Sequence, residues 1–348
     1  MNRLSWKQSF QIGCTYIGTV IGAGFASGQE ILQFFTIHGT YAYFGIFLAT
    51  VLFAWGGIRL LRFGYELRAI SYNQLTEYRF GKQLARILDS SMSIMLFGIT
   101  VAMLAGVGAL FQEQFHLSFH FGVLLTIGLT LFVLLKGMKG ILSANSIIVP
   151  CMFLFTILIF ILTLRQGIVS PSAIAEQENH WKWGLSSISY AAFNLGLAVS
   201  VLIPLGTQAG TIQTLKLGGL IGAVGLGVMM VIVHIALAAH MPGMIAFEVP
   251  MGYIAAKMNP WLQIGFSFVL WGEIFSSLIG NVYALSSQMK PGASMLQTLF
   301  LNICILTVAF FVAQIGFSKL VTILYPLFGY LSFFFILAIL FPIRHRNE

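Results

Sequence analysis

Apolar segments long enough to cross a bilayer recur along the whole chain and limit its fold more than any other feature. Hydrophobic residues make up 58% of the 348, charged residues 8%, and the mean hydropathy is +0.91, outside the range of soluble domains. A helix needs about 20 apolar residues to cross about 30 Å of hydrocarbon. Stretches such as FGVLLTIGLTLFVLL are continuously apolar rather than alternating, which excludes a β-barrel pattern. The sequence predicts an all-α integral membrane protein with ten transmembrane helices over 8–34, 39–62, 88–112, 119–136, 141–164, 184–206, 214–240, 260–287, 294–314 and 319–341.

The distribution of lysine and arginine predicts the orientation, because cytoplasmic flanks of membrane helices are enriched in these residues. With both termini inside, 14 of the 18 basic residues are cytoplasmic and four are external, namely Arg165, Lys182, Lys257 and Lys319. We therefore expect a multi-pass protein of the cell membrane with both termini in the cytoplasm. Topology and anionic lipid then account for the net charge of +8, and no nucleic acid partner is needed.

Few residues are suited to catalysis. The chain has one aspartate, Asp89, and neither an HExxH nor a GxSxG motif, so we expect no enzyme activity. The longest polar segments, 63–87 and 165–183, are predicted to be a cytoplasmic and an external loop, and neither is long enough for a second domain. The expectation is one transmembrane domain over 1–348, with no organic cofactor and no obligate protein partner.

The first apolar segment contains a stretch that is poorly suited to a membrane helix, GTVIGAGFASGQE, from Gly18 to Glu30. The sixth segment has a corresponding defect, with Asn194 and Gly196 in its middle, about half a chain away. Five spans per half is an odd number, so the halves, about 8–164 and 184–341, must be inverted relative to each other. Paired glycine-interrupted helices in inverted repeats are the pattern that indicates the binding site of a secondary transporter.

The physical reason concerns the backbone. Glycine lowers the cost of leaving the helix, and unwound backbone is tolerated at membrane depth only where it faces protein or a cavity. An alternative interpretation is close helix packing, because GTVIG and GFASG are patterns of small residues four apart. The matching defect in the sixth span favours a binding site.

The segments IGTVIGAGFASGQEI and YAAFNLGLAVSVLIPLG resemble the YkvI family of amino-acid permeases, in the amino acid-polyamine-organocation superfamily with its LeuT-type fold. The resemblance covers essentially the full length. It implies that spans one and six are both broken and that the breaks hold the amino and carboxylate groups of a substrate. The implied substrate-binding residues are Gly22, Ala23, Gly24, Phe25, Phe193, Asn194, Leu195 and Gly196.

The resemblance also implies a cation site between spans one and eight. In sodium-coupled proteins of this fold, span-one carbonyl groups bind the ion, and here these would belong to Gly18 and Ile21. In span eight, Glu273, Ser276 and Ser277 fall at i, i+3 and i+4 and therefore on one helical face. The two hydroxyl groups resemble ligands of that sodium site, although serines in helices commonly bond back to helix carbonyls.

Two glutamates lie within predicted spans, where a charged side chain costs about 2.5 to 3.5 kcal/mol on insertion scales. Glu273 is either a proton carrier, with protons replacing sodium as the coupling ion, or a neutral acid held by neighbouring hydroxyls and Asn281. Gln29 and Glu30 are candidates for an outer gate, Glu30 also for attracting a cationic substrate or for reaching the membrane interface.

These patterns predict a secondary active transporter of an amino acid or related small amine that works by alternating access, with sodium or protons as coupling ion and the lipid bilayer as its surroundings. The alternative is a small-molecule sensor, because membrane subunits of spore-germination receptors share the superfamily architecture and fold alone does not separate the two functions.

Overall fold

The computed structural model describes residues 5–68, 72–136, 139–166, 181–207, 210–289 and 294–340, and within these ranges the chain is helical, without strands. The helices are α1 (Trp6–Val20), α2 (Ala23–Ala26), α3 (Gln29–Phe34), the 3-10 helix η1 (Thr36–Tyr41), α4 (Ala42–Leu67), α5 (Tyr72–Gln114), α6 (Phe119–Lys136), α7 (Lys139–Arg165), α8 (Lys182–Thr207), α9 (Ile212–Ala239), α10 (Pro250–Met258), α11 (Pro260–Met289), α12 (Met295–Ala313) and α13 (Phe317–Leu340).

Seven of the described helical segments are long and apolar enough to cross a membrane: Thr36–Leu67, Ala85–Gln114, Lys182–Thr207, Ile212–Ala239, Pro260–Ser286, Met295–Ala313 and Phe317–Phe334. The first predicted span is absent from this set because it is divided into α1, α2 and α3, none of which reaches 18 residues. The seven segments support a multi-pass membrane protein.

Two helical features of the connections were not predicted from the sequence. Most of the predicted cytoplasmic loop 63–87 is helical, because α4 continues to Leu67 and α5 begins at Tyr72. Gly81 bends α5 with φ at +72°, a value that glycine adopts without strain. Helix α10 was not predicted at all, although Pro250 stands at its start, where proline is favoured. Most of the predicted external loop 165–183 lies outside the described residues.

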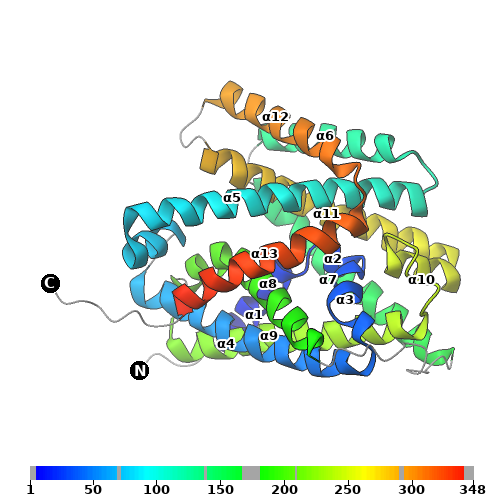
Figure 1. Cartoon of the computed structure of the whole chain (residues 1–348), viewed down its shortest axis with the longest axis horizontal. Coiled ribbons are helices and arrows are strands. Elements are labelled where there is room, and N and C mark those ends of the chain that lie inside the picture. Colours follow the sequence, from blue (N-terminus) through cyan, green and yellow to red (C-terminus); the bar gives the residue numbers. More distant parts are fainter. Residues whose placement is uncertain are drawn as a thin grey trace.

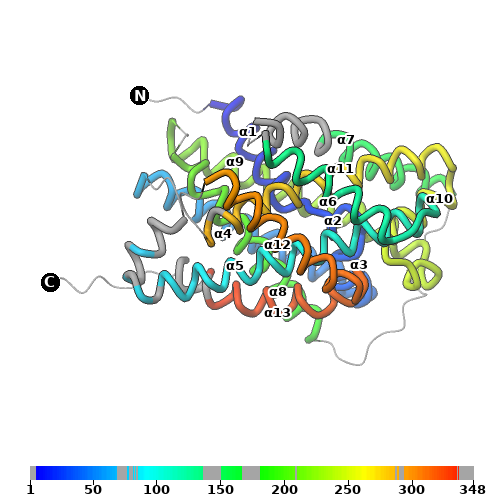
Figure 2. Tube along the Cα trace, turned by 90° about the horizontal axis from the view of Figure 1, so that it is seen from above, coloured from blue at the N-terminus to red at the C-terminus, as the bar shows by residue number. Residues whose placement is uncertain are grey.

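The long helices run roughly along one direction, and the start of α1 and the end of α13, the helices nearest the chain termini in sequence, lie at the same end of the bundle (Figures 1 and 2). Helices α3 and α10 lie toward the opposite end. Helix α4 packs against α8 and α9, α1 packs against α9, and α5 packs against α11. Helix α13 contacts both α8 and α5, so it connects these two groups of helices.

Glycines allow some of these helices to approach closely. A Cβ atom added at Gly64 would overlap the backbone carbonyl group of Ile203, and one added at Gly206 would overlap the carbonyl oxygen of Leu61. Helices α4 and α8 therefore cross with their backbones in contact, as small residues permit in membrane proteins. Gly64 and Gly206 therefore have a packing role.

Candidate functional site

The first span is interrupted within the stretch from Gly18 to Glu30, but of the predicted break residues Gly22 to Phe25 only Gly22 is non-helical, because Ala23–Ala26 form α2. Helix α1 ends at Val20, Ile21 is extended with φ −72° and ψ 107°, and Gly22 has φ −121° and ψ −170° before the four-residue α2. The chain turns again at Gly28, which has φ +84°. Because the last carbonyl groups of a helix have no intrahelical donors, the end of α1 makes backbone oxygens available at Gly18 and its neighbours.

A cavity of about 310 Å³ lies against this interruption. Its wall is formed by the α1 interruption, α5, α8 and α11, with one residue each from α3 and α13. The lining residues are Gly18, Thr19, Val20, Ile21, Gly22, Ala23, Glu30, Met92, Leu96, Ile99, Met103, Phe193, Asn194, Leu197, Ser200, Val201, Ser276, Ser277, Gly280, Asn281, Ala284, Gln288 and Tyr325. Elements far apart in sequence thus converge at the point where α1 loses its helical backbone.

Nine of the predicted site residues line this cavity: Gly18, Ile21, Gly22, Ala23, Glu30, Phe193, Asn194, Ser276 and Ser277. The structure therefore brings together the interruption in span one, the middle of span six and the serine pair of span eight. The other six predicted residues lie outside the lining. They are Gly24, Phe25, Gln29, Leu195, Gly196 and Glu273.

The prediction of a break in span six was wrong, because α8 is helical without interruption from Lys182 to Thr207. Asn194 hydrogen-bonds within the helix, donating from Nδ2 to the Tyr190 carbonyl at 3.1 Å. Gly196 instead allows α13 to approach, since an added Cβ would lie 2.5 Å from Ser332 Oγ. Leu195 packs against Gly56 of α4 in a similar way.

We expect Gly196→Val to destabilise the protein by about 1 to 3 kcal/mol, the usual cost of overpacking. Combining it with Ser332→Gly should restore part of the thermal stability, because the glycine removes the atoms that the valine meets. Thermal unfolding of the single and double variants in detergent measures both effects. A Gly196→Val variant as stable as the original chain would contradict the packing role.

Glu30 is the acidic residue of the cavity wall. It is 4% exposed, and its Oε2 atom has no hydrogen-bond partner among the described residues. The carboxyl group lies against Gly24, where an added Cβ would overlap it. Glu30 thus occupies space that any larger residue at position 24 would take. No lysine, arginine or histidine belongs to the described cavity lining.

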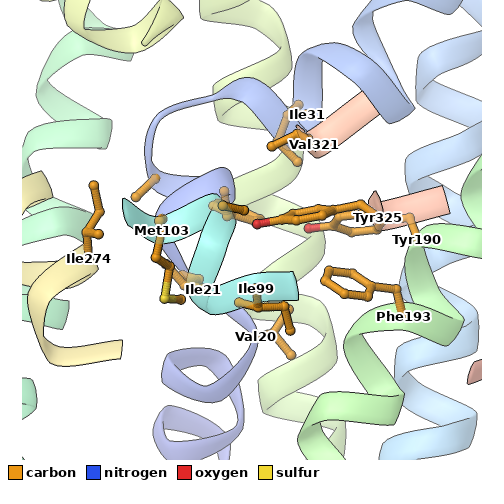
Figure 3. Packing of buried hydrophobic residues seen from close by; sticks show 14 of the residues in the cluster. Val20, Ile21, Ile31, Ile99, Met103, Tyr190, Phe193, Ile274, Val321 and Tyr325 are labelled. Carbon is orange, nitrogen blue, oxygen red and sulfur yellow. The ribbon is translucent and has the colours of Figure 1, made fainter. Parts of the chain in front are cut away.

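Tyr190 of α8 and Tyr325 of α13 accompany Glu30, and the sequence reasoning missed both. Figure 3 shows their rings beside each other, with both hydroxyl groups directed toward the interrupted part of α1. Both hydroxyls lie within electrostatic range of Glu30, although the Tyr190 hydroxyl has no well-aligned hydrogen bond among the described residues. The ring of Phe193 packs against that of Tyr325 in a tilted arrangement, with ring centroids 4.6 Å apart. The position of Tyr190, one helical turn before Asn194, is the signal that could have indicated it.

The three predicted residues of span eight do not share one environment. Ser276 and Ser277 line the cavity, whereas Glu273 does not. Glu273 is 2% exposed, and its Oε2 atom has no hydrogen-bond partner among the described residues. Asn281, considered as a partner for Glu273, instead donates from Nδ2 to Met103 Sδ at 3.4 Å.

The end of the site nearest α10 is closed by packing. The Met251 backbone N–H donates to the Ser27 carbonyl at 2.9 Å, and the Met251 side chain lies against Gly28. Gln29, predicted as a gate residue, is buried and donates from Nε2 to Ser318 Oγ at 2.8 Å. Phe25 is buried beside this junction. Helix α10 therefore covers the turn between α2 and α3.

Two carboxyl groups hold this closed end together. Glu113 at the end of α5 accepts from the backbone N–H groups of Glu248 and Val249 at 2.7 and 3.0 Å. Glu248 in turn accepts from the Phe317 N–H at 3.0 Å, at the start of α13. Burial raises the pKa of Glu248, while the Phe317 N–H and nearby Lys319 oppose that shift. The ends of α5, α10 and α13 are thereby linked.

A helical bundle with an interrupted first span beside a buried cavity has the architecture of LeuT-type membrane transporters, and solved structures share this fold. MhsT in complex with L-phenylalanine aligns with a TM-score of 0.68 at 18% identity, covering 95% of this chain and 88% of that one. A Na⁺-coupled sialic acid symporter aligns at 0.60 and 16% identity, over 93% and 75% of the two chains. A manganese transporter of Eremococcus coleocola aligns at 0.64 and 12% identity, over 96% and 79%.

Sequence similarity to two bacterial proteins identifies the family of the chain. The membrane protein YkvI of Bacillus subtilis (strain 168) is 35% identical over 333 residues, 95% of this chain and 94% of that protein. The protein YyaD of the same organism is 26% identical over 342 residues, 98% of this chain and 99% of that protein. The chain belongs to the YkvI family. No protein-family model matches it.

Proposed function

We propose that this chain is a secondary active transporter of an amino acid or related small amine in the cell membrane. It has ten membrane-spanning helices in two inverted five-helix repeats, with both termini cytoplasmic, and it works by alternating access. The observation that carries the proposal is the 310 Å³ cavity at the interruption of α1, because interrupted helices at the centre of such folds form the substrate sites of secondary transporters. The fold shared with MhsT and the sialic acid symporter supports it.

The chemistry of the cavity wall supports an amine as substrate. Its described lining contains one acidic residue, Glu30, and no basic residue. A buried carboxylate with an unpaired oxygen is a strong acceptor for an ammonium group, since hydrogen bonds between charged groups are about twice as strong as neutral ones. Asn194 and the serine pair are among the uncharged polar residues of the same wall.

We propose that the cavity is accessible from one end only, because alternating access opens a binding site to one side of the membrane at a time. The lining includes Met92 in the first half of α5 and Gln288 near the end of α11, so the cavity extends toward the end of the bundle that carries the chain termini. The α10 junction closes the other end. This arrangement corresponds to one state of the cycle, with the binding site reached from the proposed cytoplasmic side.

Sodium and protons both have candidate sites for coupling. Gly18, Ile21, Ser276 and Ser277 line one cavity, and the backbone carbonyl and hydroxyl oxygens that these residues carry are ligands that suit a hard cation. Glu273, buried one helical turn away in α11, supplies a carboxyl group that can carry a proton. Coupling arises if the ion binds one state of the bundle more tightly than the other.

Uptake by proteoliposomes tests the function. The purified protein is reconstituted and given labelled amino acids and small amines under a sodium gradient, a pH gradient or neither, with protein-free liposomes as control. Accumulation driven by one gradient is the expected result and identifies the coupling ion. Absence of uptake together with ligand-dependent thermal stabilisation would favour the sensor, and absence of both would contradict the substrate class.

If Glu273 takes part in coupling, Glu273→Gln should alter the pH or sodium dependence of uptake, because the amide neither ionises nor carries a proton. The exchange preserves size, so folding should persist. Initial uptake rates measured across pH and sodium concentration compare the variant with the original chain. Normal transport with unchanged dependence on both would contradict a coupling role.

A further inference from the structure

A groove of about 560 Å³ runs along the outer surface between α4 and α9. We call it the α4–α9 groove. It is lined by Val51, Ala54, Trp55, Ile58, Arg59, Arg62, Phe63, Glu66 and Lys216. None of these residues belongs to the substrate cavity, so the groove needs an explanation of its own.

The groove is apolar at one end and basic at the other. Val51 and Trp55, four residues apart on α4, are 46% and 40% exposed. Arg59 and Arg62 follow on the same face one and two turns later, since residues three and four apart share a helix face. Lys216 near the start of α9 completes the basic end.

One acidic residue also faces the groove. Glu66 accepts from Arg62 Nε at 2.6 Å, and both side chains are well exposed, at 41% and 53%. An exposed pair of this kind contributes little to stability. Three cationic groups and one carboxylate leave the groove with a net positive charge and hence complementary to an anion.

Glycines bring the two helices together behind the groove. A Cβ atom added at Gly219 of α9 would lie 2.6 Å from the Ile58 side chain. Farther along the same two helices, Thr50 takes the corresponding position against Gly227. A second hollow of about 340 Å³ follows there, and its wall is apolar except for Tyr43 and Thr50. The contact between α4 and α9 therefore continues along a largely apolar surface beyond the apolar end of the groove.

The dimensions match one leaflet of a bilayer. Val51 lies 11 residues before Arg62, which is about 16 Å along the axis at 1.5 Å per residue. Half of a hydrocarbon core of about 30 Å is about 15 Å. A molecule with its phosphate at the arginines would therefore extend its acyl chain along α4 to the middle of the membrane.

We propose that the α4–α9 groove binds one anionic phospholipid from the leaflet on the side of the chain termini. Arg59, Arg62 and Lys216 hold the phosphate, and an acyl chain lies over Val51 and Trp55. Basic pockets between membrane helices on the cytoplasmic side bind anionic headgroups in this way. The inference concerns a lipid site and holds whether or not the chain transports an amine.

Titration of the detergent-purified chain with phosphatidylglycerol carrying brominated acyl chains tests the site, with tryptophan fluorescence as readout. Bromine quenches the fluorescence of a tryptophan that it contacts. The Trp55→Phe variant should therefore show less quenching than the original chain, because it lacks the contribution of Trp55. Each cation near anionic lipid adds about 1 kcal/mol, so Arg59→Gln/Arg62→Gln/Lys216→Gln should bind about 100-fold more weakly. Glu66→Gln should bind more tightly, because it removes the competing carboxylate.

A control triple variant neutralises exposed bases outside the groove, Arg86→Gln/Arg165→Gln/Lys182→Gln, and should keep the original affinity. Brominated phosphatidylcholine and soluble glycerol 3-phosphate complete the comparison. Equal quenching by phosphatidylcholine, or loss of affinity in the control variant, would overturn the proposal. Binding of glycerol 3-phosphate as tight as that of the lipid would overturn it in favour of a simple phosphate site.

Discussion

Gly22→Leu is expected to reduce substrate uptake about 10- to 100-fold while leaving the fold intact. Gly22 lines the cavity, and a Cβ atom added there meets nothing within 4 Å. Its φ of −121° is open to any residue. The leucine side chain would therefore occupy cavity space that the substrate needs, and overfilling a site by this volume costs about 1 to 3 kcal/mol.

Initial uptake rates and thermal unfolding of the same preparation measure the two parts of this prediction. Gly128→Leu is a matched control, because a Cβ at Gly128 of α6 also meets nothing within 4 Å and that residue is outside the cavity lining. Gly24→Ala should differ from the Gly128→Leu control, because the added Cβ atom would overlap the Glu30 carboxyl group and displace it. Normal uptake by Gly22→Leu would show that substrate does not use this cavity.

Glu30→Gln is expected to weaken uptake of amines about 10- to 150-fold, mainly by raising KM. The exchange preserves the shape of the side chain and removes the carboxylate charge that we propose binds the ammonium group of the substrate. A hydrogen bond to a charged group contributes about 1.5 to 3 kcal/mol. Because the Oε2 atom has no hydrogen-bond partner among the described residues, the loss of charge should cost little stability.

Concentration dependence of uptake by Glu30→Gln and Glu30→Asp separates the possible roles. The aspartate should recover part of the affinity, because it restores the charge. Tyr325→Phe is a useful companion, since it removes a neighbouring hydroxyl without changing net charge. An unchanged KM in Glu30→Gln, with altered pH dependence instead, would assign Glu30 to proton transfer rather than to substrate recognition.

The local features of the chain were largely predictable from sequence. Continuous apolar segments can be satisfied in a membrane only by helices, and the predicted spans fall on the observed helices. The interruption at Ile21 and Gly22 was also predictable, because a cluster of glycines and polar groups inside an apolar segment lowers the cost of leaving the helix.

The structure differs from the sequence predictions where contacts between distant segments decide the position of a residue. Gly196 lies in an unbroken α8 because its partner is Ser332, more than a hundred residues away, and a glycine in a sequence looks the same whether it unwinds a helix or admits a neighbour. Glu273 lies outside the cavity that Ser276 and Ser277 line. Helical spacing alone placed the three together, and it does not specify which helix covers each side chain.

The sequence by itself determined that the chain is a helical membrane protein, where its first span is interrupted, and which buried acids need an explanation, because these follow from local composition and the low polarity of the bilayer. Only the tertiary structure decided that Glu30 meets Tyr190 and Tyr325 at the cavity wall, that α10 closes one end, and that Arg59 and Lys216 border one groove. These arrangements depend on side-chain packing between helices far apart in the chain, which the pattern along any single helix does not record.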